Sequence, residues 1–535
     1  MKKPFVNEPL TDFRITDNVV AFQAALAKVR EQLGRRYPLI IGGEKIYTDD
    51  VVESRNPSDP SEVIGLVSQA TPELAERAVQ EAARAFEHWH RLPASERARY
   101  LFSAAKIMRE RKHEFSALMV LEAGKPWVEA DADTAEAIDF MEFYGREMLR
   151  LGKPHPTHPE PNHETELHYI PLGVGVVIPP WNFPNAILTG LTSAAIVTGN
   201  TVVLKPASAT PVIGAWVAEL FIDELHLPAG VLNFLPGPGG SVGDVLVDHP
   251  LTRFVAFTGS KEIGLRVHQR AAAVHPGQKW LKRTVLEMGG KDGILVDETA
   301  DLDAAAAGIV SAAFGFSGQK CSACSRAIVV ESVYDEVLAK IVELTARVDV
   351  GDPALGPGIE MGPVIDGKAL AKHLEYIGIG KGEGRLVAGG EVLGERAGRR
   401  VDVVAHQGGR QVGAQAVGAG GRAAVGRGRG QVDGRRGLGL RLLLALADGL
   451  EPDERGHRLD LGAGHDVELL DARGERRRDD GLHLHRLQHH DRGTGLDHVA
   501  DGGGGRDDER GRRRAEDAAL VTGDAVGDVV DLDEV

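Results

Sequence analysis

The chain has 535 residues, enough for about three domains at roughly 100–200 residues each and for a large buried core. Its formal net charge of −16 excludes a generally basic nucleic-acid-binding protein. No stretch reaches about 18 uninterrupted apolar residues, so no membrane span is predicted. Two cysteines cannot build a disulfide framework, and no apolar run follows the first lysines. We therefore expect a cytoplasmic protein with neither nucleic-acid nor membrane partners.

The chain order of the predicted elements indicates an α/β fold. Apolar residues recur at helical spacing in residues 74–86 and 100–108. Strands are then expected at residues 173–179, 201–205, 231–235 and 253–258, with helices at 185–198 and 211–225. A second α/β region follows, with strands at 283–286, 293–296 and 326–330 and a helix at 334–348. This alternation predicts βαβ units and a parallel sheet covered by helices on both faces.

The composition changes abruptly near residue 395. Residues 401–535 contain 27 Gly and 20 Arg but no Lys, Ile, Phe, Tyr, Trp, Met, Cys, Asn or Ser. The missing residues largely have A/T-rich codons, so a G+C-rich gene translated in a shifted frame would give this pattern. A genuine low-complexity tail is the alternative. The Arg-Gly repeats at 421–436 lack the interleaved aromatics of an RNA-binding segment, and the histidines at 482–490 carry little weight as a metal site.

A cysteine in a loop is the candidate nucleophile. Cys321 lies in the sequence FSGQKCSAC, which follows an alanine-rich helical run. A thiol is a useful nucleophile only as the thiolate, so it needs access and a polar environment. Cys321 and Cys324 also form a C-x-x-C pair, which leaves a redox function open. Two cysteines cannot form a Cys₄ zinc site and no suitably spaced histidines accompany them before the tail, so we expect no metal.

Four further segments place polar groups at predicted strand ends, where α/β sheets bind ligands. The sequence IPPWNFP puts the amide of Asn182 in a turn made rigid by prolines. The sequence VVLKPAS places Lys205 at a strand end, and FTGSKEIG offers a glycine turn at Ser260, suited to a pyrophosphate at a helix start. The sequence VLEMGGK ends a strand with Glu287 and two glycines. Any one of these segments could be an ordinary turn, and its polar residue an ordinary surface or capping residue.

Taken together and in this order, the PWNFP, KPA, FTGS, LExGGK and GQxC segments resemble those of the aldehyde dehydrogenase superfamily. Segments such as AIDF at 137–140 and PGQKW at 276–280 resemble its bacterial 1-pyrroline-5-carboxylate dehydrogenase subfamily, over about residues 5–394. The resemblance implies an aldehyde dehydrogenase fold with a Rossmann-like cofactor domain, an α/β catalytic domain and a small bridging hairpin. The implied parts are an arm (1–36), the NAD-binding domain (37–154 and 171–286), the hairpin (155–170), an incomplete catalytic domain (287–395) and the anomalous tail (396–535).

The activity implied by the resemblance is NAD-dependent oxidation of L-glutamate γ-semialdehyde to L-glutamate, the second step of proline degradation, through a cysteine thioester. Cys321 would be the nucleophile, Glu287 the general base and Asn182 a donor to the oxyanion. The hydroxyl of Ser322 would touch the carboxylate of this small-molecule substrate.

The implied cofactor site comprises Ile178, Pro180, Trp181, Lys205, Ser208, Gly259, Ser260 and Gly264. Ser208 departs from the family pattern, in which a glutamate often binds the ribose of NAD and repels the 2′-phosphate of NADP. A neutral serine removes that repulsion, so NADP is less firmly excluded and NAD remains the expected cofactor.

Three expected family features are not found after residue 394: an EIFGP motif, a glycine-rich loop for the substrate α-carboxylate, and a terminal strand that pairs with a partner subunit. The resemblance therefore implies a homo-oligomer only with an intact C-terminus. The alternatives are a catalytically impaired, frameshifted fragment, an aldehyde dehydrogenase for another semialdehyde, and a CoA-acylating enzyme. Glu287 argues against the last, because a hydrolytic base would compete with CoA for the thioester.

Overall fold

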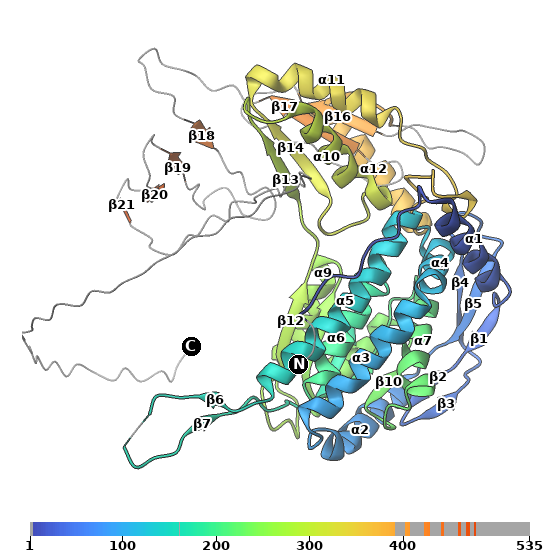
Figure 1. Cartoon of the computed structure of the whole chain (residues 1–535), viewed down its shortest axis with the longest axis vertical. Coiled ribbons are helices and arrows are strands. Elements are labelled where there is room, and N and C mark those ends of the chain that lie inside the picture. The colour runs from blue at the N-terminus through green and yellow to red at the C-terminus, as the bar shows by residue number, and fades with distance from the viewer. Residues whose placement is uncertain are drawn as a thin grey trace, which may run out of the picture. The chain divides into compact units, whose positions relative to one another are not determined.

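The computed structural model describes residues 4–159 and 161–390, together with the backbone of six short strands between residues 402 and 477. The chain divides into two units, Met1–Val467 and Glu468–Val535. The helices and the strands up to Arg427 belong to the first unit, and Figure 1 labels most of them. No helix among the described residues is both long and apolar enough to cross a membrane.

The helices of the first unit have the following bounds: α1 (Thr16–Arg30), α2 (Pro72–Trp89), α3 (Ala94–Glu110), α4 (Lys112–Ala123), α5 (Trp127–Leu151), α6 (Ala186–Val197), α7 (Pro211–Glu219), α8 (Asp244–Asp248), α9 (Lys261–Ala272), α10 (Leu302–Phe314), α11 (Tyr334–Thr345) and α12 (Gly367–Glu383). The strands are β1 (Arg35–Tyr37), β2 (Leu39–Ile41), β3 (Glu44–Ile46), β4 (Val51–Arg55), β5 (Val63–Ser68), β6 (His155–Pro156), β7 (Glu166–Leu167), β8 (Val174–Ile178), β9 (Thr201–Leu204), β10 (Leu232–Phe234), β11 (Thr252–Thr258), β12 (Arg283–Glu287), β13 (Asp292–Val296), β14 (Cys324–Val329), β15 (Arg385–Ala388), β16 (Asp402–His406) and β17 (Arg422–Arg427).

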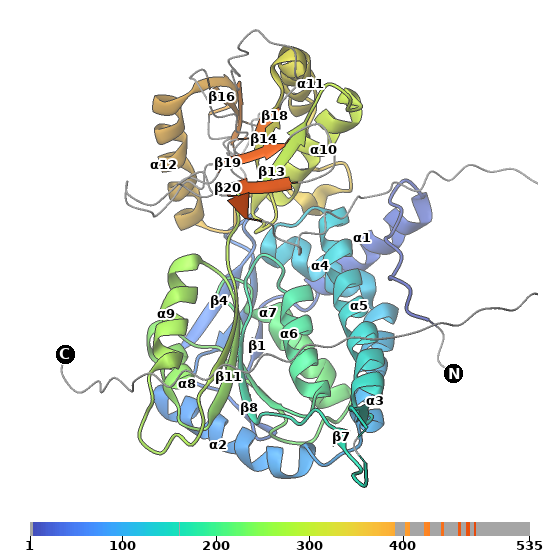
Figure 2. The same ribbon diagram turned by 90° about the vertical axis from the view of Figure 1, so that its left-hand side faces the viewer.

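The largest sheet of the described residues has seven strands in the order β12-β11-β8-β9-β10-β2-β3. Its first five strands are parallel to their neighbours, whereas β2 and β3 are antiparallel. Neighbouring residues such as Val176 and Val177 face two different apolar clusters. Helices α3 to α7 contribute to one cluster and α2, α8 and α9 to the other, on opposite sides of the sheet (Figure 2). The predicted parallel sheet with helices on both faces is therefore confirmed.

A second sheet has the order β13-β14-β17-β16-β15 and packs against α10 and α11 around its own apolar cluster. Two smaller sheets lie within residues 4–159 and 161–390. The strands β1, β5 and β4 form one of them, and β6 and β7 form a two-stranded hairpin within the range expected for a hairpin.

The structure differs from the sequence-based prediction at two places. Before residue 155 the apolar periodicity predicted helices alone, at residues 74–86 and 100–108. The structure also has the short strands β1 to β5 there, between α1 and α2. The helix expected over residues 211–225 ends as an α-helix at Glu219 and continues as one π-helical turn, Leu220–Glu224. The strands β1 to β3 have three residues each, which is too few for a period-two pattern to stand out from a helical one.

A buried glutamate ties α7 to the small sheet. Glu122, in α4, is fully buried, and its carboxylate accepts hydrogen bonds from the backbone N–H groups of Val212 and Ile213 at 2.8 and 2.9 Å. It also accepts the hydroxyl of Ser54 at 2.7 Å. Burial raises the pKa of Glu122 to about 7, although these three hydrogen bonds act in the opposite direction.

We predict that Glu122 makes stability depend on pH. Because its pKa is higher in the folded chain than the value of 4.5 for the unfolded chain, its stabilising effect is full below pH 4.5 and is lost as pH rises to about 7. Relative to Glu122→Gln, the free energy of unfolding of the wild type should fall by up to about 3 kcal/mol over that range. Thermal unfolding of both proteins from pH 4.5 to 8 measures this, and melting temperatures that run parallel would contradict it.

Candidate active site

The carboxyl ends of four neighbouring parallel strands meet at one edge of the large sheet. In the register of the sheet, Thr258 of β11 pairs with Glu287 of β12, and Phe257 pairs with Ile178 of β8. Leu204, the last residue of β9, pairs with Val177 of β8. The segments that follow these strands therefore start side by side, as predicted for a ligand site in an open α/β sheet.

The turn after β8 carries Asn182. Its side-chain Nδ2 donates a hydrogen bond of 2.8 Å to the backbone oxygen of Gln319, two residues before Cys321. The turn is followed by α6, whose first N–H, on Ala186, donates to the carboxylate of Asp133 at 2.6 Å. The structure thus brings the proline-rich turn and the cysteine loop together, although 137 residues separate Asn182 and Gln319.

The loop that carries Cys321 is held in an uncommon backbone conformation. After α10, Phe316 and Ser317 have φ angles of 50° and 58°, a region that non-glycine residues seldom adopt. Both are buried, and the hydroxyl of Ser317 donates to the oxygen of Gly362 at 2.7 Å. The side chain of Gln319 accepts the N–H of Ile365 at 2.9 Å. Contacts with residues 362–365 therefore hold the loop from its far side.

The two cysteines of the C-x-x-C pair lie in different environments. Both are free thiols, but Cys321 is exposed and Cys324 is buried. Burial raises the pKa of the Cys324 thiol to about 11. Cys321 therefore has the access that a nucleophile needs, whereas Cys324 has the environment of a packing residue.

Glu287 and the glycines after it approach the cysteine loop. Glu287 ends β12 and is exposed. A Cβ atom added to Gly290 would lie 2.7 Å from the carbonyl oxygen of Cys321, closer than real Cβ contacts allow. Only glycine therefore lets the segment after Glu287 pass against the backbone of Cys321.

An ion pair and a hydroxyl adjoin the nucleophile. The ammonium of Lys320 lies 2.5 Å from a carboxylate oxygen of Glu129, in α5. Ser322, on the other side of Cys321, is exposed. The predicted catalytic and substrate residues Cys321, Asn182, Glu287 and Ser322 thus lie on segments that the structure brings into contact or that adjoin such segments. Lys320–Glu129 was not predicted, because no sequence pattern pairs residues so far apart.

The residues predicted for the cofactor site lie at the same sheet edge. Lys205 follows β9 directly and is 6% exposed, and burial lowers its pKa to about 8. Ser260 is the N-cap of α9, and its hydroxyl accepts the N–H of Ile263. A Cβ on Gly264 would lie 2.6 Å from the sulfur of Met288, so glycine allows α9 to approach the segment after β12.

The other predicted cofactor residues adjoin these. Ile178 ends β8, Pro180 is buried and Trp181 is partly exposed, with its ring centroid 6.3 Å from that of Phe316. Gly259 precedes Ser260, and Ser208 is exposed in the turn before α7. A buried ammonium and a capped helix N-terminus at the same sheet edge fit a dinucleotide, which offers sugar hydroxyls to the former and a pyrophosphate to the latter.

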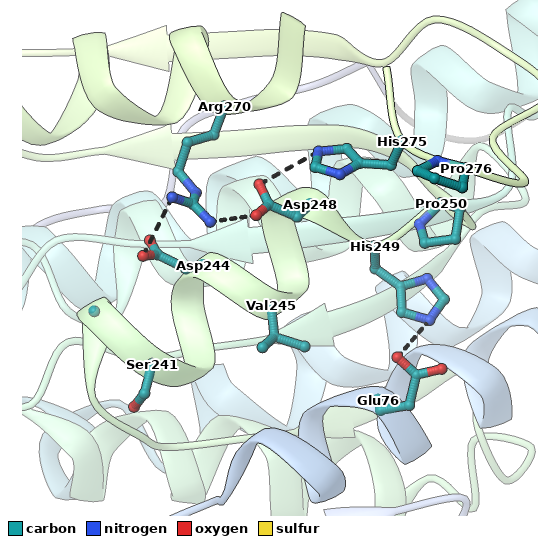
Figure 3. Close-up of a pocket in the computed structure, with 11 residues that line it drawn as sticks. Glu76, Ser241, Asp244, Val245, Asp248, His249, Pro250, Arg270, His275 and Pro276 are labelled. Atoms are coloured by element: carbon teal, nitrogen blue, oxygen red, sulfur yellow. Dashed lines mark hydrogen bonds and ion pairs between the residues drawn. The ribbon is translucent and has the colours of Figure 1, made fainter. Parts of the chain in front are cut away.

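A separate hollow of about 560 Å³ lies beside α2, α8 and α9 (Figure 3). Its polar side chains contact each other: Arg270 pairs with Asp244 and Asp248, and the Nε2 of His249 lies 3.0 Å from a carboxylate oxygen of Glu76. None of the predicted catalytic or cofactor residues lines it. Within the described residues, no group of three His, Cys, Asp or Glu side chains could hold a metal ion. The histidines at 482–490 lie outside the described residues, and of the Arg-Gly repeats at 421–436 only the backbone of the strand β17 (Arg422–Arg427) is described.

The family model described as "Aldehyde dehydrogenase family" matches residues 46–405, about two thirds of the chain. The chain therefore belongs to the aldehyde dehydrogenase family, as the sequence motifs indicated. A protein of Geobacillus sp. (strain WCH70) named 1-pyrroline-5-carboxylate dehydrogenase is 61% identical over 391 residues, which are 73% of this chain and 76% of that protein.

Solved structures show the same relationship. A 1-pyrroline-5-carboxylate dehydrogenase from Thermus with bound NAD matches with a TM-score of 0.76 and 45% identity, over 80% of this chain and 83% of that one. Proline utilization A from Bdellovibrio bacteriovorus matches with a TM-score of 0.75 and 38% identity, over 80% of this chain and 44% of that one. The aldehyde dehydrogenase fold predicted from the sequence is thus confirmed.

We predict that Gly290→Ala displaces the nucleophile. The added methyl group would collide with the carbonyl oxygen of Cys321, so the loop must move, and a misplacement of about 1 Å can cost on the order of 10²-fold in kcat. Gly289→Ala is the matched control, because a Cβ there meets no atom within 4 Å. Steady-state aldehyde oxidation measures both, and equal activities would contradict the prediction.

Proposed function

We propose that the protein oxidises L-glutamate γ-semialdehyde, the open form of 1-pyrroline-5-carboxylate, to L-glutamate with NAD, the second step of proline degradation. The observation that supports this most directly is the hydrogen bond from Asn182 to Gln319, which joins the predicted oxyanion donor to the predicted nucleophile loop. The substrate is inferred from the name of relatives that are about 60% identical.

In the proposed mechanism the thiolate of Cys321 adds to the aldehyde carbon, and the carbonyl oxygen becomes an oxyanion. The amide of Asn182 and the backbone N–H of Cys321 donate hydrogen bonds to that oxygen as its charge develops. NAD, when bound, accepts the hydride, which leaves a thioester on Cys321. Glu287 then takes a proton from water, whose oxygen attacks the thioester carbon and releases the carboxylate and the thiolate. Overall, aldehyde, water and NAD⁺ give carboxylate, NADH and two protons.

Exposure of Glu287 agrees with such a role. A general base for hydrolysis must reach water, and a carboxylate at the free end of a strand can do so. Ser322 would donate its hydroxyl to the substrate carboxylate from the other side of Cys321. Glu287 also argues against a CoA-acylating reaction, in which the thioester has to survive until CoA attacks.

For the cofactor, Lys205 would hydrogen-bond the adenosine ribose, and the Gly259–Gly264 turn would hold the pyrophosphate. Ile178, Pro180 and Trp181 would contact the cofactor from the turn after β8. The exposed Ser208 offers no charge to repel a 2′-phosphate, so NADP would be used more slowly than NAD but not rejected outright. We place the protein in the cytoplasm and propose that, with an intact C-terminus, the hairpin β6–β7 bridges subunits of a homo-oligomer.

We further propose that residues after about 395 are translated in a shifted frame. The support is the abrupt loss of nine residue types, whereas the family match extends to residue 405. Sequencing the DNA around codons 390–400 tests it. A one- or two-base change that restores an EIFGP-like motif supports the proposal, and a sequence that agrees with the chain favours a genuine tail.

The substrate assignment is tested by NADH formation from pyrroline-5-carboxylate, compared with succinate semialdehyde and betaine aldehyde. The chain itself and a frame-restored version should both be assayed. A frame-restored enzyme that prefers either competitor would overturn the substrate. Activity in the restored enzyme alone would identify the chain as an impaired fragment of the same enzyme.

We predict a division of labour between Cys321 and Glu287. Cys321→Ala should abolish oxidation, because no covalent intermediate can form. Glu287→Gln should slow hydrolysis on the order of 10²–10⁴-fold and show a burst of NADH close to one equivalent per subunit. Cys324→Ala should be nearly silent, because that thiol is buried and has a raised pKa. An inactive Cys324→Ala beside an active Cys321→Ala would contradict these roles, and loss of activity in both would favour a redox pair.

A further inference from the structure

A fully buried ion pair lies beneath the candidate active site. Lys125 follows Gly124, which ends α4 with a φ of 67°, and its ammonium lies 2.6 Å from the carboxylate of Asp133, in α5. Both side chains are 0% exposed. Such a pair is weak evidence for stability, because well-packed apolar residues of similar volume often stabilise a fold as well or better. Its surroundings suggest another role.

Each partner of the ion pair touches the turn that carries Asn182. The ammonium of Lys125 lies 4.2 Å from the ring centroid of Phe183, the residue after Asn182. The second oxygen of the Asp133 carboxylate accepts the N–H of Ala186, which begins α6. The ion pair therefore contacts this turn at Phe183, directly after Asn182, and again at Ala186, where α6 begins.

The same ammonium also touches the cysteine loop. It lies 4.7 Å from the ring centroid of Phe316, one of the two residues with a positive φ before Cys321. A cation is attracted to the face of an aromatic ring, and more strongly where water is excluded. An uncommon backbone conformation persists only where the surroundings hold it, and Lys125 is one of the groups in contact with it.

We propose that Lys125 and Asp133 are positioning residues. They hold the Asn182 turn and the Cys321 loop at the relative position in which the side chain of Asn182 donates its hydrogen bond to the backbone oxygen of Gln319. The inference rests on the proposed roles of Asn182 and Cys321. Lys125 acts through Phe183 and Phe316, whereas Asp133 acts through Lys125 and Ala186. Neither touches the reacting atoms.

The chain offers a matched control in a second Lys–Asp pair, which joins α4 directly to α5. Lys112, in α4, lies 2.9 Å from Asp131, in α5, with side chains 9% and 1% exposed. This pair contacts the N-terminal segment instead: Lys112 donates to the oxygen of Pro9, and Asp131 accepts the N–H of Thr11. Asp131 and Asp133 are two residues apart, so they point to different sides of α5.

The test compares Lys125→Ala/Asp133→Asn with Lys112→Ala/Asp131→Asn in the full chain. Asparagine keeps an acceptor for the N–H of Ala186, and neither double variant leaves a buried charge unpaired. Hydrogen exchange of the peptides that cover residues 315–323 is the first readout, because it needs no turnover. The exchange rate of these peptides should rise on the order of tenfold or more in Lys125→Ala/Asp133→Asn, because this variant loses a contact with the loop. It should stay unchanged in Lys112→Ala/Asp131→Asn, which keeps that contact.

The second readout is aldehyde oxidation by the same variants, made in the frame-restored chain where the chain itself is inactive. In the Lys125 variant kcat should fall on the order of 10²-fold, with little change in KM for NAD. In an Asn182→Ala background the same change should cost far less, because both substitutions then disturb one contact. If the Lys125→Ala variant does not fold, Lys125→Met/Asp133→Asn keeps the side-chain volume. Its exchange rate and kcat should change in the same directions by smaller factors.

The outcomes separate the two proposals. Unchanged exchange at residues 315–323, or a kcat no lower than that of the Lys112 variant, would overturn the positioning role. Retention of full activity by Cys321→Ala and Asn182→Ala would overturn the proposed function instead, while the exchange data would still report on the loop. Equal effects of the two double variants would identify Lys125–Asp133 as a structural pair only, which also contradicts the proposal.

Discussion

The arrangement of the candidate active site depends on the parallel pairing of four adjacent strands, β12, β11, β8 and β9. Parallel strands all end at the same edge, so Glu287, the turn of Ser260, the turn of Asn182 and Lys205 start within a few strand spacings of each other. The connections between the strands can then differ freely in sequence. The second sheet has only to deliver one loop, that of Cys321, to an edge already lined with polar groups.

Much of the fold could be predicted because its strongest signals are periodic. The strands β8, β9 and β11 are short apolar runs between helical segments, and the structure places them within a residue or two of the expected bounds. The strands β1 to β3 could not be read in the same way, because three residues show no reliable period. The π-helical turn at Leu220–Glu224 was also missed, since it depends on local hydrogen bonding that has no composition signature.

The candidate site residues could be proposed from the sequence only because several continuous motifs occur together. Each segment that carries Cys321, Asn182 or Glu287 could by itself be an ordinary turn, and their combination and order resemble the aldehyde dehydrogenase superfamily. The sequence could not reveal Lys125 or Asp133, because an isolated lysine after a glycine and an acid in a helix usually lie on the surface. Nor could it predict the positive φ of Phe316, because a bulky residue seldom adopts that conformation and only tertiary contacts impose it.

Helix α5 links these parts through three acidic side chains that each pair with a lysine. Glu129 pairs with Lys320 beside the nucleophile, Asp131 with Lys112 and the N-terminal segment, and Asp133 with Lys125 beneath the active site. The pair of Glu129 is partly exposed, so it contributes little to stability, whereas the fully buried pair of Asp133 is costly to desolvate. Neither is well explained as a source of stability. Both pairs are better explained by the positions that they fix. Through Glu129 and Asp133, the single helix α5 sets the position of Lys320, the residue before Cys321, and of the turn that carries Asn182.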